Sequence, residues 1–239
     1  MLRKSILVLA AGLLCSSMLH GVALASVTGP IWGQSVGSEN LIGSRESGGG
    51  GVVGSAAWDN GDYDISWNIT NNDNKWTYTY TVKVDRKDVS HFLLEVTNDG
   101  NPFNVLEGSD VNIVQPATVY SSGTSNPNMP NSLYGIKFDF GGNLTTYTIV
   151  TDRAPVWGVF YAKDGKDGGV AVTAWSNALN YDNYQTSMTL TETDFIVRPD
   201  GVGSGVNGNP VPVPGAAWLL GSGLLGLAGL GRRKKVAVA

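Results

Sequence analysis

The sequence predicts an all-β protein, built as one β-sandwich or jelly-roll-like domain. Three observations support this class. Apolar and polar residues alternate with period two in several short runs. Clusters of Gly, Asn, Asp and Pro separate these runs at intervals of about a dozen residues. No stretch keeps a 3.6-residue apolar period over three turns. A closed barrel is the alternative arrangement of the same strands.

Residues 1–25 are predicted to form a signal peptide. Arg3 and Lys4 precede an apolar run over residues 6–14, which is too short to span a bilayer and so argues against a retained anchor. The segment closes with the small residues of a signal-peptidase site. The predicted cleavage follows Ala23 and Ala25 and leaves Ser26 as the first residue.

A lipoprotein is the alternative to simple cleavage, because Cys15 lies within the same segment. Leu14, directly before it, is bulky where lipidation sites have a small residue. Cys15 is the only cysteine of the chain, so no internal disulfide framework is possible. His20 also lies in the signal segment, which leaves His91 as the single histidine after cleavage. Zinc sites of the Cys/His type and thiol catalysis are therefore excluded.

Charge separates the middle of the chain from its ends. The whole chain has a net charge of −4, but six of its 16 basic residues lie in the end segments. All 20 acidic residues lie in the middle, which holds ten basic residues. A domain this acidic repels nucleic acid, whose binding depends on Lys and Arg at the phosphates. We expect no nucleic-acid partner.

The central domain is predicted over residues 26–200, long enough for one substantial core. Its clearest passage is residues 63–84, where two alternating runs flank the sequence NNDN. This pattern predicts two antiparallel strands joined by a turn, with one face apolar and aromatic and the other polar. The other predicted strands are 91–96, 111–114, 134–140, 145–150, 155–162, 168–175 and 186–197.

Two segments of the domain read as loops. Residues 121–131, SSGTSNPNMPN, form a long polar loop at one end of the domain, where binding loops often lie. Residues 48–51 are all glycine and form a second flexible point.

No pattern names a catalytic, cofactor-binding or metal-ligating residue. DNGDYD at 59–64 superficially resembles a calcium-binding loop, but it lacks Gly and Glu at the positions that an EF-hand requires. We therefore predict a solvated turn there. KDGKDGG at 163–169 reads as a hairpin loop. No motif singles out a pair of carboxylates, as a glycosidase requires. Asp88 and His91 could pair across a turn, as a structural hydrogen bond. We therefore expect a protein without enzyme activity.

The number of tryptophans suggests an alternative hypothesis for the function. The protein would then be a secreted carbohydrate-binding module, in which exposed rings stack on sugars. Alternation places Trp67 and Trp76 with the core residues. Trp32, Trp58 and Trp175 lie beside predicted loops, where they could be exposed.

The C-terminal segment combines a linker, a short apolar stretch and a basic end. Residues 201–209 are Gly-rich and flexible, and the prolines that follow stiffen the chain. Residues 215–231 include six Leu and six Gly. As a helix they would cover about 25 Å of a hydrocarbon core about 30 Å thick. The leucines supply about −3 kcal/mol of insertion free energy, which makes a marginal membrane anchor. A basic cluster then holds the C-terminus in the cytoplasm. It comprises Arg232, Arg233, Lys234 and Lys235.

Residues 210–239 resemble the PEP-CTERM sorting signal of exported bacterial proteins, in which a short motif, a transmembrane helix and a basic tail follow in this order. The stretch VPVPGAAWLLGSGLLGLAGLGRRKK is similar to forms that begin the helix with PGA, Trp and LLGSGLLGL. The matching motif residues are Val211, Pro212, Val213, Pro214 and Gly215, with Val213 where the family usually has Glu.

The resemblance implies recognition by exosortase, a membrane protease-transpeptidase, and removal of the helix near the motif. It implies transient inner-membrane anchoring and then a cell-surface or extracellular place, often alongside exopolysaccharide and biofilm matrix. Signal peptidase, exosortase, the membrane and exopolysaccharide are the partners expected on this basis. The middle of the chain is also similar to an unnamed group of such exported proteins, in DVSHFLLEV, SNPNMPNSLYGIKFD and TDRAPVWGVFYAKDGK. That group carries no known activity.

Overall fold

The structure, a computed structural model, describes residues 29–110, 113–139 and 142–203. The predicted signal peptide with Ala23, Ala25 and Ser26 lies outside the described residues. Residues 204–209 of the linker, the sorting motif 211–215 and the basic cluster 232–235 lie outside them too. Within the described ranges, no helix has the length and apolar character needed to cross a membrane.

Strands dominate the described part of the chain, and the helices found there are four short 3₁₀ turns, which confirms the all-β class. The strands are β1 Ile42–Ser47, β2 Gly51–Ser55, β3 Tyr63–Asn72, β4 Lys75–Val84, β5 His91–Glu95, β6 Ile113–Tyr120, β7 Leu133–Asp139, β8 Leu144–Thr151, β9 Arg153–Gly158, β10 Phe160–Asp167, β11 Val170–Ser176 and β12 Ile196–Gly203. The 3₁₀ helices are η1 Ser38–Asn40, η2 Ala56–Trp58, η3 Asn177–Asn180 and η4 Glu192–Asp194.

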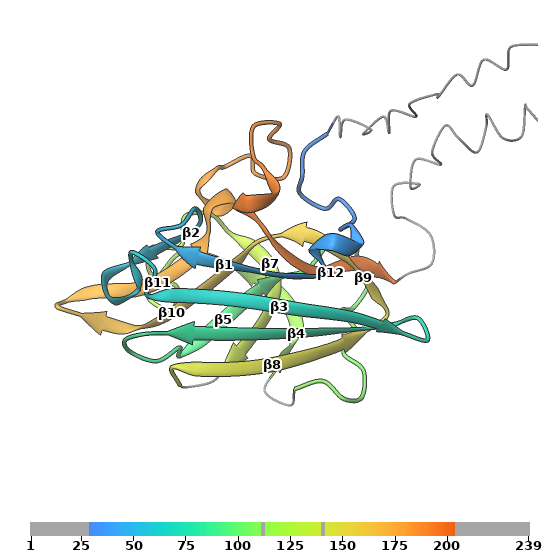
Figure 1. Cartoon of the computed structure of the whole chain (residues 1–239), viewed down its shortest axis with the longest axis horizontal. Coiled ribbons are helices and arrows are strands. Elements are labelled where there is room, and N and C mark those ends of the chain that lie inside the picture. Colours follow the sequence, from blue (N-terminus) through green and yellow to red (C-terminus); the bar gives the residue numbers. More distant parts are fainter. Residues whose placement is uncertain (1–28, 111–112, 140–141, 204–239) are drawn as a thin grey trace, which may run out of the picture.

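Ten of these strands form one curled sheet, in the order β6-β7-β5-β10-β11-β2-β1-β3-β4-β8. Within it β1 and β2 pair in parallel, and the other pairs are antiparallel. Strands β9 and β12 form a separate antiparallel ribbon. Figure 1 shows β3, β4 and β8 side by side in front, with β5 and β10 behind them.

The curl brings the inner faces of distant strands together over one aromatic core. The rings of Phe138 on β7 and Tyr147 on β8 stack with centroids 4.0 Å apart. The rings of Tyr63 on β3 and Phe160 on β10 stack at 5.8 Å. Phe138, Tyr147 and Tyr63 are each flanked by polar residues on the outer face, because successive side chains of a strand point to opposite faces. Large aromatic rings therefore fill the space between the two halves of the sheet.

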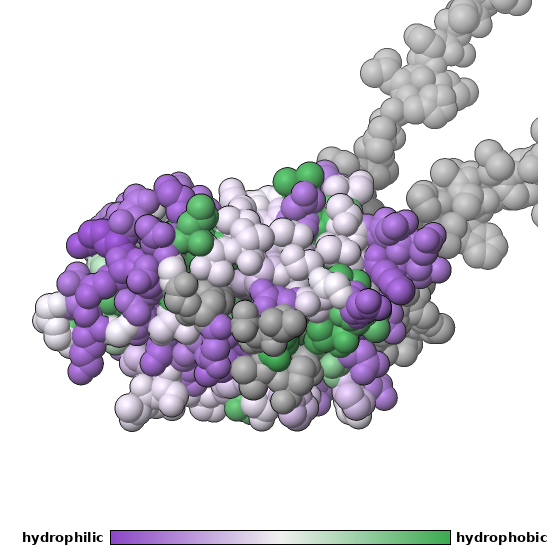
Figure 2. All heavy atoms as spheres, turned by 90° about the horizontal axis from the view of Figure 1, so that it is seen from below, coloured by the Kyte–Doolittle hydropathy of each residue, from purple (hydrophilic) through white to green (hydrophobic). Residues whose placement is uncertain are grey.

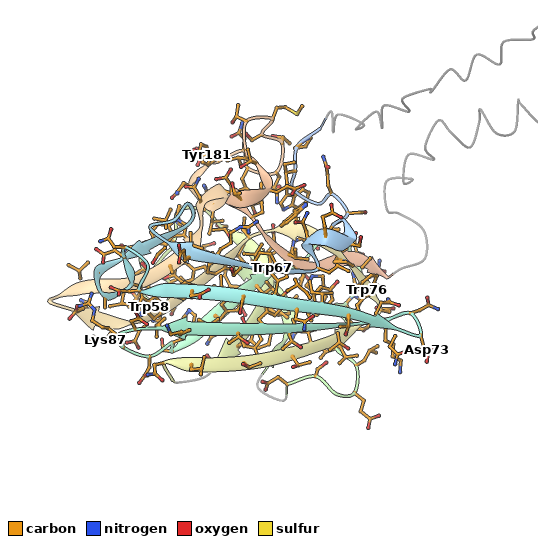
Figure 3. All side chains as sticks on the ribbon, in the orientation of Figure 1. Trp58, Trp67, Asp73, Trp76, Lys87 and Tyr181 are labelled. Atoms are coloured by element: carbon orange, nitrogen blue, oxygen red, sulfur yellow. The ribbon has the colours of Figure 1, made fainter. Side chains whose placement is uncertain are left out.

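The predicted hairpin over residues 63–84 is confirmed. Strands β3 and β4 pair in register from Tyr63↔Val84 to Asn72↔Lys75. The turn residues Asp73 and Asn74 have φ angles of 51° and 63°. Two successive positive φ angles make a type I′ turn, whose twist suits a two-residue hairpin and which Asn and Asp tolerate. Figure 3 shows Asp73 at the exposed tip of this hairpin.

A second predicted hairpin, at residues 163–169, is present but tighter than a seven-residue loop. Strand pairing continues along β10 to Asp167, and β11 begins at Val170, with a bulge between Lys163 and Lys166. Only Gly168 and Gly169 form the turn, with φ angles of 56° and 88°. Such angles again give a type I′ turn, here made by two glycines.

The sequence pattern misplaces several strands. Residues 155–162, predicted as one strand, divide into β9 and β10, which belong to different sheets. Residues 186–195, predicted as part of a strand, form a loop that ends in η4, and β12 begins only at Ile196. The threonines of this loop bond locally instead, since Thr191 and Asp194 close a capping box around η4. The flexible point at 48–51 proves to be a tight connection between two strands that the sequence pattern did not reveal, β1 and β2.

Strand β5 is buried on both faces, which explains why HFLLE shows no alternation. Phe92 and Leu94 point into the aromatic core, while the odd-numbered residues lie on the outer face. Loop residues from outside the sheet cover that outer face, among them Asn126 and Tyr184. A strand covered on both faces reads as a continuous apolar run.

The outer edges of the ten-stranded sheet carry features that discourage pairing with another chain. Beyond β8, the backbone N–H groups of Leu106 and Asp110 donate to Val150 and Thr148, at 2.8 Å each. On the other edge, β6 contains Pro116, which has no N–H to donate. Figure 2 shows the β8 side: hydrophilic and neutral colours prevail, and hydrophobic residues form small separate groups.

Candidate functional site

The first and last described segments of the domain meet at strand β9. Ser35 forms an isolated antiparallel bridge with Val156, and Arg198 of β12 pairs with the same Val156 from the other side. The N–H of Gly33 also donates to the carbonyl of Trp157 at 2.8 Å. The segment that follows the predicted signal peptide and the strand that runs into the predicted linker therefore lie on the two edges of one strand.

A buried polar group, here named the Glu95 cluster, joins these two segments to the main sheet. It consists of Trp32, Glu95, Tyr184 and Arg198. The Glu95 side chain is 2% exposed and that of Arg198 is 0% exposed. Arg198 Nε donates to Glu95 Oε2 at 3.2 Å. Trp32 Nε1 donates to Oε1 at 3.0 Å, and the Tyr184 hydroxyl donates to the same oxygen at 2.9 Å.

Further contacts hold the Glu95 cluster in one geometry. The backbone N–H of Val159 donates to Glu95 Oε2 at 3.0 Å. The Arg198 guanidinium lies over the Trp32 ring, 5.4 Å from its centroid, and its Nη1 donates to Thr97 Oγ1 at 2.8 Å. Gly158 leaves the necessary room, since a Cβ there would lie 2.1 Å from Arg198 Nε. Burial raises the pKa of Tyr184, and the neighbouring Glu95 carboxylate raises it further.

These contacts give the Glu95 cluster a structural role. A buried charge is tolerated only when an opposite charge and hydrogen bonds compensate for lost hydration. Here both carboxylate oxygens accept hydrogen bonds from protein donors and the pair has almost no exposure, so the carboxylate offers no open coordination position to a substrate. The arrangement ties residues 32, 95, 184 and 198 into one unit.

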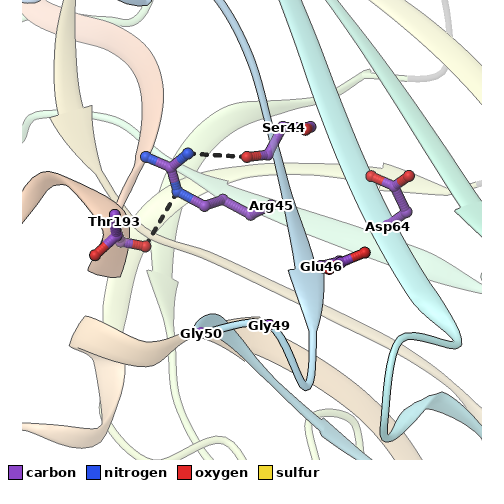
Figure 4. A pocket seen from close by; sticks show the side chains of 7 residues that line it. All are labelled: Ser44, Arg45, Glu46, Gly49, Gly50, Asp64 and Thr193. Atoms are coloured by element: carbon purple, nitrogen blue, oxygen red, sulfur yellow. Dashed lines mark hydrogen bonds between the residues drawn. The ribbon is translucent and has the colours of Figure 1, made fainter.

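The surface has a polar hollow of about 450 Å³ where β1, β3 and the η4 loop meet (Figure 4). It is lined by Ser44, Arg45, Glu46, Gly49, Gly50, Asp64 and Thr193. Arg45 forms its cationic wall, and its Nε, Nη1 and Nη2 donate to the backbone carbonyls of Thr193, Ser44 and Glu192 at 3.1, 2.8 and 2.9 Å. The guanidinium also lies 5.1 Å from the Trp67 ring centroid, so it is held from both sides.

Two carboxylates stand side by side in this hollow. Glu46 and Asp64 are register partners on β1 and β3. Burial raises the pKa of Asp64, and the charge of Glu46 raises it further, while Lys83 lowers it. Apart from this carboxylate pair and Arg45, the lining groups are polar or glycine. Binding sites for small molecules are lined mostly by apolar side chains, so the hollow offers little area for holding a substrate.

The tryptophans do not form a ring platform in the described part of the chain. Trp58 is fully buried, and Trp67 and Trp175 are 3% and 8% exposed. Trp76 and Trp32 are partly buried and pack against the core. The prediction that Trp67 lies in the core is confirmed, and the exposure considered for Trp58 and Trp175 is wrong. Trp58 and Trp175 lie near loops, but their rings are buried, and an aromatic side chain buries a large apolar area.

The remaining polar candidates are placed as follows. His91 is hydrogen-bonded to Asn126 on the 121–131 loop, at 3.1 Å, and Asp88 is exposed. Asp62, in the predicted turn at 59–64, forms an ion pair with Arg86 at 3.2 Å. Among the residues that the structure describes, no three His, Cys, Asp or Glu side chains are grouped to hold a metal ion.

Sequence reasoning missed the Glu95 cluster and the hollow. A signal for the first does exist: Glu95 and Arg198 each stand at the end of an apolar run, in HFLLEV and DFIVRP. A charge in such a run is buried only when it is paired. The pairing itself joins residues 103 positions apart, so local pattern cannot identify the partner.

Searches against protein-family models, curated proteins and solved structures find no match to this chain.

Proposed function

We propose that the protein is an exported, non-enzymatic component of the cell surface or extracellular matrix, sorted and processed through a PEP-CTERM/exosortase system. The observation that carries the proposal is the order of features at the C-terminus. A Pro-Val-Pro motif, a short glycine-rich apolar stretch and four basic residues follow one another over residues 212–235. Insertion of this stretch is marginal in free energy, which suits a temporary anchor.

The architecture supports a display role. We propose that the curled sheet acts as a β-sandwich of the jelly-roll-like kind, in which β3, β4 and β8 form one layer and β5, β7 and β10 the other. The ring contacts across the interior support this assignment, for example Tyr80 on β4 against Phe92 on β5 at 6.3 Å. The Glu95 cluster fastens Trp32, near the start of the described domain, and Arg198, near its end, to the main sheet. Such fastening suits a protein that is exposed outside the cell.

The absence of enzyme activity is supported by the make-up of the described surface. The polar hollow beside β1 and β3 has a carboxylate pair but few apolar side chains in its lining. Exposed large apolar side chains are scattered over the domain. They are Ile42, Val119, Leu144, Val170, Tyr181 and Met188.

Replacing Pro212 and Pro214 together with Ala is expected to leave uncut protein in the inner membrane. Proline fixes φ and lacks an N–H, so it keeps the chain extended ahead of the helix, in the form that a protease cleft accepts. Alanine favours continuation of the helix into the motif. Fractionation and immunoblotting of cells that carry exosortase measure the share of full-length protein.

Pro210→Ala is the matched control, because it removes a nearby proline outside the motif. We expect normal processing of this variant. Processing of the double variant at the wild-type rate would contradict a role for the motif.

A further inference from the structure

The 121–131 loop is folded over the outer face of β5 and β10, where two side-chain contacts hold it, and a third contact ties it to η3. His91 Nε2 on β5 lies 3.1 Å from Asn126 Oδ1. The Tyr161 hydroxyl on β10 donates to the carbonyl of Pro127 at 2.6 Å. At the far end, Asn131 Nδ2 donates to the carbonyl of Leu179 at 2.9 Å.

The loop has an ordered internal structure around Asn126. The Asn126 side-chain amide donates from Nδ2 to the carbonyl of Ser121 at 3.0 Å. The backbones of Gly123 and Asn126 exchange two hydrogen bonds, at 3.2 and 3.1 Å. Asn126 is 7% exposed and Met129 is 2% exposed. Asn126 thus connects the interior of the loop to the imidazole ring beneath it.

The surroundings of His91 disfavour its charged form. Burial lowers the pKa of His91 to about 4, and the positive charges of Lys137 on β7 and Lys163 on β10 lower it as well. The hydrogen bond to Asn126 and the charge of Asp139 on β7 act in the opposite direction. The loop itself contributes no charged residue, and Tyr161, whose ring centroid lies 6.3 Å away, is neutral because burial raises its pKa.

We propose that the 121–131 loop is an acid-sensitive cover, which lifts off β5 and β10 when His91 takes up a proton. Since Asn126 Oδ1 accepts, Nε2 carries the hydrogen of the neutral ring, and the second proton goes to Nδ1. The imidazolium then lies under the loop near two lysines, shielded from water. Lifting the loop returns water to the ring and leaves the sheet intact, because the loop is a connection between β6 and β7 and is not itself a strand.

The direction of the pH effect follows from the two pKa values. An uncovered histidine has a pKa near 6.5 and the covered one about 4. The closed form therefore binds fewer protons than the open form between these values, so closure weakens as the pH falls below about 6.5. The effect is complete below about pH 4 and amounts to at most about 300-fold in the closing equilibrium, because Lys137 and Lys163 stay beside His91 when the loop lifts.

Opening changes what the domain presents to its surroundings. Leu93 on β5 and Tyr161 on β10 belong to the same outer face as His91 and are fully buried in the closed form. Met129 is buried with them. The open form exposes these side chains together as an apolar and aromatic surface, so the loop controls access to a surface that is closed at neutral pH.

Hydrogen exchange of the purified full chain, kept in detergent, tests the proposal. After correction for intrinsic exchange rates, the protection of the Gly123 and Asn126 amides should fall by at least tenfold and at most about 70-fold between pH 7.5 and pH 4.5. Amides of the β3–β4 hairpin should keep their protection. Unchanged loop protection, or an equal loss in the hairpin, would overturn the local cover.

Two variants separate the proton from other effects of acid. In His91→Gln the group cannot titrate, so loop protection should no longer depend on pH over this range. Asn126→Asp places a carboxylate beside the imidazole, which stabilises the charged ring under the closed loop, and should remove most of this loss of protection. A wild-type pH response in either variant would refute the role of His91.

Discussion

Arg198→Met lowers the free energy of unfolding by about 3–5 kcal/mol, because it leaves the Glu95 carboxylate buried without its opposite charge. Glu95 is 2% exposed and cannot regain water without disturbing Trp32 and Tyr184, which donate to it. The loss should appear as a lower midpoint of urea unfolding with an unchanged slope. Full-length protein in detergent and protein recovered from the medium should show the same shift.

Two further variants show that the loss comes from the unpaired charge. The double variant Arg198→Met with Glu95→Leu removes both charges and should regain a large part of the lost stability. Lys83→Met is the surface control, because Lys83 and Asp85 form an exposed ion pair at 3.2 Å. It should stay within about 0.5 kcal/mol of wild type. A cost for Arg198→Met as small as that of Lys83→Met would contradict the structural role of the Glu95 cluster.

Gly54→Ala is expected to destabilise the domain by about 3 kcal/mol, because the added methyl group would clash with the backbone of Trp58. A Cβ on Gly54 would lie 1.8 Å from the carbonyl oxygen of Trp58 and 2.9 Å from Ser47 Cβ. Trp58 cannot move aside easily, since it is fully buried and its Nε1 donates to the carbonyl of Arg86 at 3.0 Å. Thermal unfolding followed by near-ultraviolet circular dichroism measures the change.

Gly165→Ala is the matched control for this substitution. A Cβ on Gly165 meets no atom within 4 Å, and the φ angle of this residue is not positive. It should melt within about 2 °C of wild type. Equal melting temperatures for the two glycine variants would show that the η2 turn does not pack against β2 as described.

The sequence predicts the hairpins of this fold well, and the reason is physical. In β3 and β4 one face of each strand packs on the aromatic core and the other is wet, so alternation is visible in the sequence. Type I′ turns require residues that accept positive φ, and Asn, Asp and Gly stand at the two turns. Local chemistry and tertiary packing agree at these places.

Strand β1 shows why the prediction fails elsewhere. Its inward positions hold Gly43 and Arg45, so its sequence carries no apolar alternation. Gly43 is needed because the Trp67 ring crosses it, and a Cβ there would lie 2.5 Å from that ring. Arg45 is inward because the rings of Trp67 and Trp157 stack with its guanidinium. Both reasons lie in partners distant in sequence, which period-two patterns do not report.

The same distance hides the candidate sites. Trp32, Glu95 and Arg198 come from three parts of the chain, and Glu46 reaches Asp64 only through strand pairing. The predicted sorting signal differs from these sites, because each of its parts is a contiguous run of residues. Sequence alone is therefore enough to recognise the motif, the apolar stretch and the basic cluster in this order. They stay a prediction, since they lie outside the described residues.

Mass spectrometry of the terminal peptides of the extracellular protein tests the export and sorting proposal most directly. Protein should be collected from the medium or released from the cell surface of a strain that has exosortase. The N-terminal peptide is expected to begin at Ser26, and the C-terminal peptide to end near the 211–215 motif, without the apolar stretch. A surface or extracellular protein that still begins at Met1 would contradict export through a cleaved signal peptide, and one that still ends at Ala239 would contradict exosortase processing.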